Sequence, residues 1–266
     1  MDEQTEISLR FGGDQGVGEL PLLGALFVAV LTIMLFSCGH RKFLSVFFVL
    51  VFFSGLDERI ALAGTNIHLY RIAICLGWIS LAYNARLRPI KFVFVDKLFL
   101  CWVCVNAVAF TVLYADFQAF INRINFGFTA IGSYFLIRET VRNWDELDCV
   151  FRSLTWVITL VAIFMVIEFL SGKNPLHVLG GVPEEVASRD GQLRCQGPFA
   201  HPIIAGTFGA TLFPFAFAAY QQKLCSRNLA LVGMISCAVV TITSFFSRAR
   251  SGIPWRGKQL GFVESA

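Results

Sequence analysis

Eight stretches of this chain are apolar enough to lie in a membrane, and no other feature of the sequence constrains the fold as strongly. The stretches are residues 20–37, 43–56, 70–84, 98–115, 119–137, 153–171, 203–220 and 229–246. A helix crosses the hydrocarbon core of a bilayer with roughly 20 apolar residues, within a range of about 17–25. The second and third stretches are short, so each is expected to extend into its flanks or to be partly re-entrant. The sequence therefore predicts an all-α polytopic membrane protein with about eight transmembrane helices.

The composition excludes the soluble classes of protein. Hydrophobic residues make up 56% of the 266 residues and charged residues only 15%, whereas a soluble domain has about 45–50% apolar and about 25% charged residues. Disordered, collagen-like and disulfide-scaffold proteins are excluded on the same grounds. The net charge of +4 arises in short loops between the apolar stretches rather than on one patch. The expected partner is therefore a lipid bilayer, and no nucleic acid is expected.

Basic residues follow every second apolar stretch, and this alternation predicts the orientation. They are Arg41, Lys42, Arg86, Arg88, Lys91, Lys97, Arg138, Arg142, Arg152, Lys223 and Arg227. Short loops rich in Lys and Arg lie in the cytoplasm, so the loops at 57–69, 116–118 and 172–202 are expected outside. The acidic segment 1–19 lacks the basic start of a signal peptide, and the first stretch is expected to stay as an anchor. The chain then divides into segment 1–19, six helices over 20–171, a periplasmic loop over 172–202, two helices over 203–246 and a polar tail over 247–266.

Five arginines fall outside the cytoplasmic set and are expected at the outer membrane surface. They are Arg59, Arg71, Arg123, Arg194 and Arg248. A guanidinium group binds phosphate through paired hydrogen bonds, and helix N-termini favour anions. Together these features predict a site for the diphosphate of a membrane lipid. The alternatives are that Arg59 pairs with Asp57 or Glu58, and that Arg123 only extends to the interface.

Residues 194–209, RCQGPFAHPIIAGTFG, are the most informative segment of the chain. Pro202 suits the first turn of a helix, and Gly197 and Pro198 indicate a turn just before it. His201 is then near a helix start, where a neutral imidazole suits a general base, so it is the candidate catalytic residue. The alternative is a capping or hydrogen-bonded structural histidine. Glu168 is expected to pair with an arginine in preference to acting as an acid or base, and no metal or cofactor motif is found.

Three stretches, residues 56–81, 117–147 and 180–214, resemble the bacterial O-antigen ligase and polysaccharide polymerase superfamily. The spacing of Arg194, Gly197-Pro198-Phe199, Pro202 and Gly206 is the most specific part of this resemblance. The resemblance implies an inner-membrane protein that transfers or polymerises an undecaprenyl-diphosphate-linked oligosaccharide on the periplasmic side without a metal. It also implies that arginines hold the diphosphate, with Arg194 at the position of the Arg in the family motif. Family members carry further spans and another periplasmic loop, so this chain is expected to correspond to their N-terminal portion.

Two other functions stay open at this stage. One is a transporter or flippase for an anionic or lipid-linked substrate, and the other is a non-catalytic remnant of such an enzyme. Transporters usually place polar or broken-helix sites near the bilayer midplane. The interiors of the stretches at 20–37, 43–56, 153–171 and 229–246 are almost wholly apolar, which disfavours transport.

Overall fold

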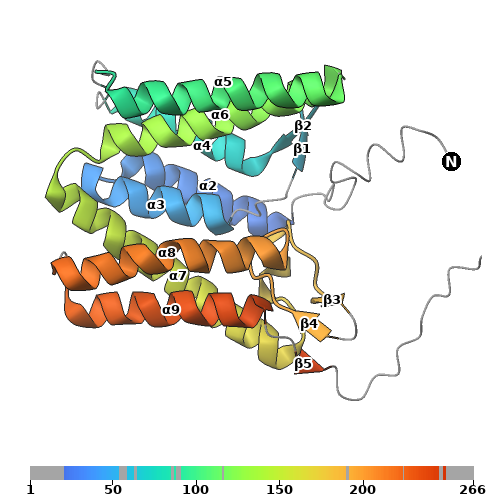
Figure 1. The fold of residues 1–266 in the computed structure, drawn as a ribbon. Coiled ribbons are helices and arrows are strands. Elements are labelled where there is room, and N and C mark those ends of the chain that lie inside the picture. The colour runs from blue at the N-terminus through green and yellow to red at the C-terminus, as the bar shows by residue number, and fades with distance from the viewer. Residues whose placement is uncertain are drawn as a thin grey trace, which may run out of the picture.

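The computed structural model describes residues 21–53, 59–62, 65–84, 87, 91–115, 117–189, 192–223, 225–245 and 248–249. Within these ranges the fold is all-α, as predicted. The α-helices are α2 (Leu22–Ser37), α3 (His40–Phe53), α4 (Leu69–Tyr83), α5 (Phe94–Tyr114), α6 (Phe117–Thr140), α7 (Trp144–Ser171), α8 (Pro202–Gln222) and α9 (Arg227–Phe245). Consecutive helices cross the molecule in alternating directions (Figure 1).

Each helix overlaps one of the predicted apolar stretches, and the largest difference is at the start of α7. That helix begins at Trp144, well before the predicted residue 153, because its first turn is polar and escapes a reading based on hydropathy. The Glu146 carboxylate accepts hydrogen bonds from the N–H groups of Arg142 and Asn143 at 2.6 and 3.2 Å. Acidic groups in this position satisfy the open N–H groups of a helix start.

Four helices, α5, α7, α8 and α9, are long and apolar enough to cross a membrane. The helices α2, α3 and α4 are apolar but have only 16, 14 and 15 residues. Helix α6 has 24 residues and carries several polar side chains. Length and composition thus indicate a membrane protein, and the larger count of about eight spans stays a prediction.

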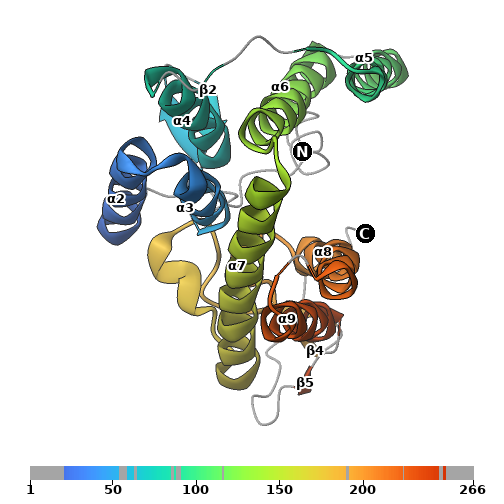
Figure 2. The ribbon, with the colours of Figure 1, turned by 90° about the vertical axis from the view of Figure 1, so that its left-hand side faces the viewer.

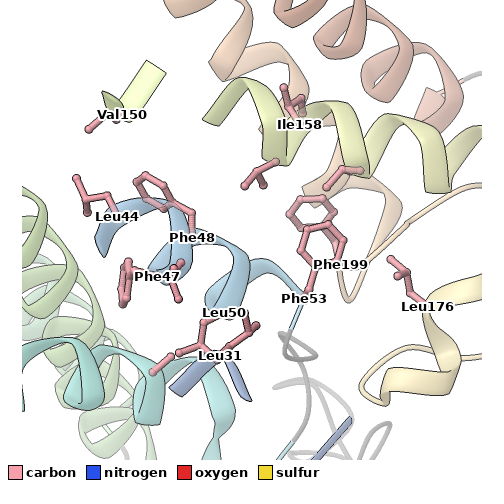
Figure 3. Packing of buried hydrophobic residues seen from close by; sticks show 14 of the residues in the cluster. Leu31, Leu44, Phe47, Phe48, Leu50, Phe53, Val150, Ile158, Leu176 and Phe199 are labelled. Carbon is pink, nitrogen blue, oxygen red and sulfur yellow. The ribbon is translucent and has the colours of Figure 1, made fainter. Parts of the chain in front are cut away.

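Helix α7 lies at the centre of the bundle, with α3 packed on one side and α9 on the other (Figure 2). The pair α2 and α4 lies beyond α3, the hairpin of α5 and α6 is at the edge, and α8 packs against α9. The core is built mainly from phenylalanine and aliphatic side chains of α3 and α7, among them Phe43, Leu50 and Val161. Figure 3 shows Phe53 and Phe199 next to each other, and both belong to the same buried cluster as Ile158 of α7, so the loop before α8 contributes to this core.

Helices α8 and α9 approach each other closely along a glycine face. A Cβ atom at Gly209 would lie 2.6 Å from Thr241 Oγ1 and 2.8 Å from the carbonyl oxygen of Cys237. At Gly206 the nearest atom would be Ser244 Oγ, at 2.6 Å. Small residues of this kind let helix backbones pack together where lipid leaves no hydrophobic drive for association.

The two longest of the loops expected outside, 57–69 and 172–202, contain short strands that were not predicted from the sequence. Strands β1 (Arg59–Leu62) and β2 (Thr65–His68) form an antiparallel hairpin. The 3₁₀ helix η1 (Pro175–Leu179) is followed by β3 (Ala187–Arg189) and β4 (Gln192–Arg194), and β4 pairs with β5 (Arg248–Ala249). Both sheets lie at the end of the bundle where α4, α6 and α8 begin (Figure 1). Helices α3, α5, α7 and α9 begin at the opposite end (Figure 1), and the orientation in a membrane stays a prediction.

Candidate functional site

The turn that leads into α8 is held by two buried polar side chains. The carboxylate of Glu168, on the last turn of α7, accepts hydrogen bonds from the N–H groups of Gln196 and Gly197 at 3.0 and 2.8 Å. The Asn174 Nδ2 group donates to the carbonyl oxygen of Gly197 at 2.8 Å. Glu168 was expected to pair with an arginine, and that prediction is wrong. The end of α7 directs its carboxylate at backbone N–H groups, which satisfy it instead.

A glycine is required at the centre of this turn. Gly197 has a φ of +57°, in the left-handed region that side chains rarely adopt. A Cβ atom there would also lie 2.9 Å from Cγ of Met165. The turn therefore packs directly onto α7 with no room for a side chain at Gly197.

His201 is the N-cap of α8, as the structural alternative for this residue supposed. Its Nδ1 atom accepts a hydrogen bond from the N–H of Ile203 at 3.2 Å, and Pro202 occupies the first helical position. The imidazole is exposed, and its Nδ1 atom is used by the capping hydrogen bond. A role of His201 in proton transfer stays a prediction.

A cavity of about 490 Å³ lies between α3, α4, α6 and the start of α8. Most of its wall is apolar, and Thr129, Ser133 and Ile137 line it at intervals of four residues along one face of α6. These three positions cover about 12 Å of helix. Its lining residues are Phe47, Phe48, Val51, Phe52, His68, Tyr70, Ile74, Thr129, Ser133, Ile137, Phe199, Ala200 and Ile204. A volume of this size falls in the range of small-molecule sites, about 300–1,000 Å³.

Arg71 lies beside the end of this cavity where α4 begins. Its guanidinium carbon is 5.5 Å from the centre of the Tyr70 ring, and Tyr70 and His68 both line the cavity. The Nε atom of Arg71 is buried and has no hydrogen-bond partner among the described residues. Arg59 lies opposite His68 in the β1–β2 hairpin, so its backbone belongs to the same region; its side chain is outside the described part of the structure.

The other three predicted arginines lie elsewhere. Arg194 is in β4, where its neighbour Leu193 pairs with Arg248 of β5, so the backbone brings these two arginines together. Figures 1 and 2 place this sheet beside α9, away from the β1–β2 hairpin beside α4. The side chain of Arg248 is not among those described.

Arg123 lies with neither Arg71 nor Arg194 and contacts α5. Its guanidinium carbon lies 3.4 Å from the centre of the Phe110 ring, and Nη1 donates to Asn106 Oδ1 at 3.3 Å. Arg123 is the seventh residue of α6, so it sits roughly 9 Å along the helix from its start, within the helix layer. The five arginines therefore occupy three places rather than one cluster, because strand register and hairpin packing, not membrane depth alone, decide where each one lies.

No family profile, curated protein or solved structure matches this chain. The resemblance to the O-antigen ligase superfamily stays a prediction, and the assignment of function rests on the site itself. Among the described residues, no group of three His, Cys, Asp or Glu side chains could hold a metal ion.

Charged and thiol groups of the 172–202 segment have shifted pKa values. The Lys173 ammonium is 2.7 Å from the Glu184 carboxylate, which raises the pKa of Lys173 and lowers that of Glu184. His177 Nε2 lies 4.0 Å from the same carboxylate. The fully buried Cys195 has a pKa raised to about 12, first by burial and then by the charge of Glu168. The thiol is therefore protonated and unreactive at neutral pH.

Sequence reasoning missed two buried polar residues. Asp96, in the first turn of α5, accepts hydrogen bonds from the Val93 N–H and the Tyr134 hydroxyl and forms an ion pair with Arg138 at 2.9 Å. It ties α5 to α6 at the basic end of the bundle. Asn174 caps η1 by accepting from the Leu176 N–H at 3.0 Å. An Asp at a helix start and an Asn before Pro175 are both recognisable capping signals, so the sequence did contain the information.

Proposed function

We propose that this chain is a multi-pass protein of the bacterial inner membrane that acts on an undecaprenyl-diphosphate-linked oligosaccharide in surface polysaccharide synthesis. All eight helices, α2–α9, cross the membrane in this proposal. The short helices α2, α3 and α4 are about 21–24 Å long at 1.5 Å per residue. Spans of this length are accommodated by local thinning of the bilayer and by flanking residues that extend to the interface.

The observation that carries the proposal is the apolar cavity with an arginine beside one end. Hydrocarbon suits the wall formed by Phe48, Phe52 and Ile137. A diphosphate suits the guanidinium of the half-buried Arg71, whose buried Nε atom has no hydrogen-bond partner among the described residues. A lipid diphosphate combines these two chemistries in one molecule. Arg194 and Arg248 are at the same end of the bundle and stay predicted contacts of the anionic headgroup.

The proposed reaction is glycosyl transfer. A hydroxyl oxygen of the acceptor forms a bond to the anomeric carbon of the donor sugar, and the bond from that carbon to the diphosphate oxygen breaks. The hydroxyl proton passes to a base, for which His201 is the predicted group, and the diphosphate leaves with its lipid. The lone pair of the neutral imidazole is on Nδ1, which accepts the Ile203 N–H, so His201 takes up the proton only after this cap opens. Arginine stabilises the negative charge that develops on the leaving oxygen.

Complementation tests this proposal in a bacterial strain that lacks surface-polysaccharide ligation. The matched variants are Arg71→Gln and Arg227→Gln, because both arginines rest on a tyrosine ring, at 5.5 and 5.7 Å, but at opposite ends of the bundle. We expect the wild-type chain and Arg227→Gln to restore ligation and Arg71→Gln to fail at equal protein level. Failure of the wild type, or equal activity of both variants, contradicts the proposal.

A transporter or flippase is the second candidate, because the cavity lies among the helices rather than on a surface loop. It predicts movement of a fluorescent lipid diphosphate between the leaflets of a proteoliposome, without transfer of sugar. Binding with neither transfer nor movement supports the third reading, a non-catalytic protein of the same origin.

A further inference from the structure

The buried carboxylate of Glu168 has no cationic partner among the described residues. Its two oxygens are used by two N–H groups of one turn. Burying a carboxylate costs desolvation free energy that packing alone does not offset, and ionisable residues within membrane helices usually have a functional role.

The turn that Glu168 binds is fixed from both sides. Glu168 holds the N–H of Gly197, and Asn174 holds its carbonyl oxygen. The carbonyl of Gln196 then accepts the N–H of Phe199 at 3.1 Å, which closes the turn. Three polar contacts thus determine where the chain leaves Gly197.

The residues that follow this turn form part of the cavity wall. Phe199 and Ala200 both line the cavity. The Phe199 ring is 6.1 Å from the ring of Phe52 and 5.1 Å from that of Phe208, measured between centres. A displaced turn would therefore move the wall of the cavity that Phe199 and Ala200 form.

We infer that Glu168 is a positioning residue for the cavity: it fixes the turn at 196–197 so that Phe199 and Ala200 close the cavity next to the proposed diphosphate site. The inference rests on the proposed function for the identity of the ligand. The effect of Glu168 on the turn does not depend on any ligand.

The chain contains its own reporter for this turn. Cys195 precedes it, is fully buried and has a pKa of about 12, so an alkylating reagent finds almost no thiolate near neutral pH. Cys237 in α9 is equally buried but has no described contact with the turn, so it reports general unfolding. Peptide-resolved mass spectrometry after alkylation measures both thiols in the same sample.

The experiment compares wild type with Glu168→Gln, Glu168→Asp and the control Glu184→Gln in lipid nanodiscs. Glutamine keeps the shape of the side chain but offers one acceptor oxygen, so it can keep only one of the two backbone hydrogen bonds. We expect Cys195 in Glu168→Gln to be alkylated about tenfold faster, with Cys237 unchanged. Farnesyl diphosphate, used as a soluble probe, should bind about tenfold more weakly. Glutamine also removes the charge that helps to raise the pKa of Cys195, so the discriminating variant is Glu168→Asp, which keeps the charge on a side chain one methylene shorter. Cys195 should be alkylated faster in Glu168→Asp than in wild type, and Glu184→Gln should match wild type in both readouts.

Three outcomes overturn the inference. Unchanged alkylation of Cys195 in Glu168→Asp means that the turn does not depend on how the carboxylate is placed, and an increase confined to Glu168→Gln then reflects the lost charge. Faster alkylation of both thiols means that Glu168 only stabilises the fold. A lower melting temperature with unchanged affinity for farnesyl diphosphate has the same meaning. If wild type does not bind the probe at all, the proposed ligand is wrong, and the Cys195 readout alone still decides whether Glu168 positions the turn.

Discussion

A methyl group added at Gly209 is expected to separate α8 from α9 and to destabilise the protein. The added Cβ would meet Thr241 Oγ1 at 2.6 Å and the Cys237 carbonyl oxygen at 2.8 Å. The Thr241 hydroxyl already donates to that same carbonyl at 2.9 Å. The methyl group would therefore press on a hydrogen-bonded pair, and one member of that pair is backbone that cannot rotate away.

The size of the effect follows from two opposing contributions. Overpacking in a tight interior costs about 1–3 kcal/mol, whereas replacing glycine by alanine within a helix returns up to about 1 kcal/mol. Gly209→Ala is therefore expected to lower the free energy of unfolding by roughly 1–2 kcal/mol. The matched control is Gly127→Ala in α6, where the added Cβ would meet only a methyl group of Val103, at 3.3 Å. That variant is expected to be neutral or slightly stabilised.

Unfolding in mixed micelles with increasing sodium dodecyl sulfate, followed by circular dichroism, measures both variants against wild type. The close approach of α8 and α9 is refuted if Gly209→Ala is as stable as wild type. It is also refuted if Gly127→Ala loses the same amount, because the loss would then be a general response to alanine.

Phe199→Ala should lower the free energy of unfolding by about 3–5 kcal/mol, because Phe199 is fully buried. Phe215→Ala, at an exposed position of α8, should change it little. Equal losses for the two variants in the same micelle assay would contradict the packing of the turn. The ion pair between Lys173 and Glu184 should be pH-dependent in a defined direction. Because the folded pKa of Glu184 lies below its usual 4.5, the contribution of the pair is present above that pH and is lost as the pH falls through the lowered value. The difference in melting temperature between wild type and Glu184→Gln should therefore shrink on acidification from about pH 7 to about pH 3, and a constant difference would show that the pair contributes nothing.

Much of the fold could be predicted because apolar runs and capping residues are local signals. The eight apolar stretches locate the eight helices, and Gly197, Pro198 and Pro202 correctly indicate a turn followed by a helix start. The short strands were missed because three or four residues carry too little pattern to be recognised. Their pairing depends on distant segments: β4 pairs with β5, more than 50 residues further along the chain.

The candidate site was harder to predict because its contacts are not local. The partners of Glu168 are backbone groups 28 and 29 residues away, and a backbone N–H leaves no mark in the sequence. The sequence predicts all five arginines at the outer membrane surface. In the structure, Arg59 and Arg194 belong to two different sheets, so strand pairing separates them. Arg123 is the exception, because its partner Asn106 lies across a short hairpin and could have been found by pairing the two helices.

The proposed ligand of the cavity beside Arg71 is a lipid diphosphate. It is tested by the retention of undecaprenyl diphosphate against undecaprenol, measured by native mass spectrometry of the protein released from nanodiscs. Wild type and Arg227→Gln should retain the diphosphate in preference to the alcohol, and Arg71→Gln should lose about tenfold in affinity for it. Equal retention of the two lipids by wild type, or undiminished binding by Arg71→Gln, would show that the cavity does not hold a lipid diphosphate beside Arg71.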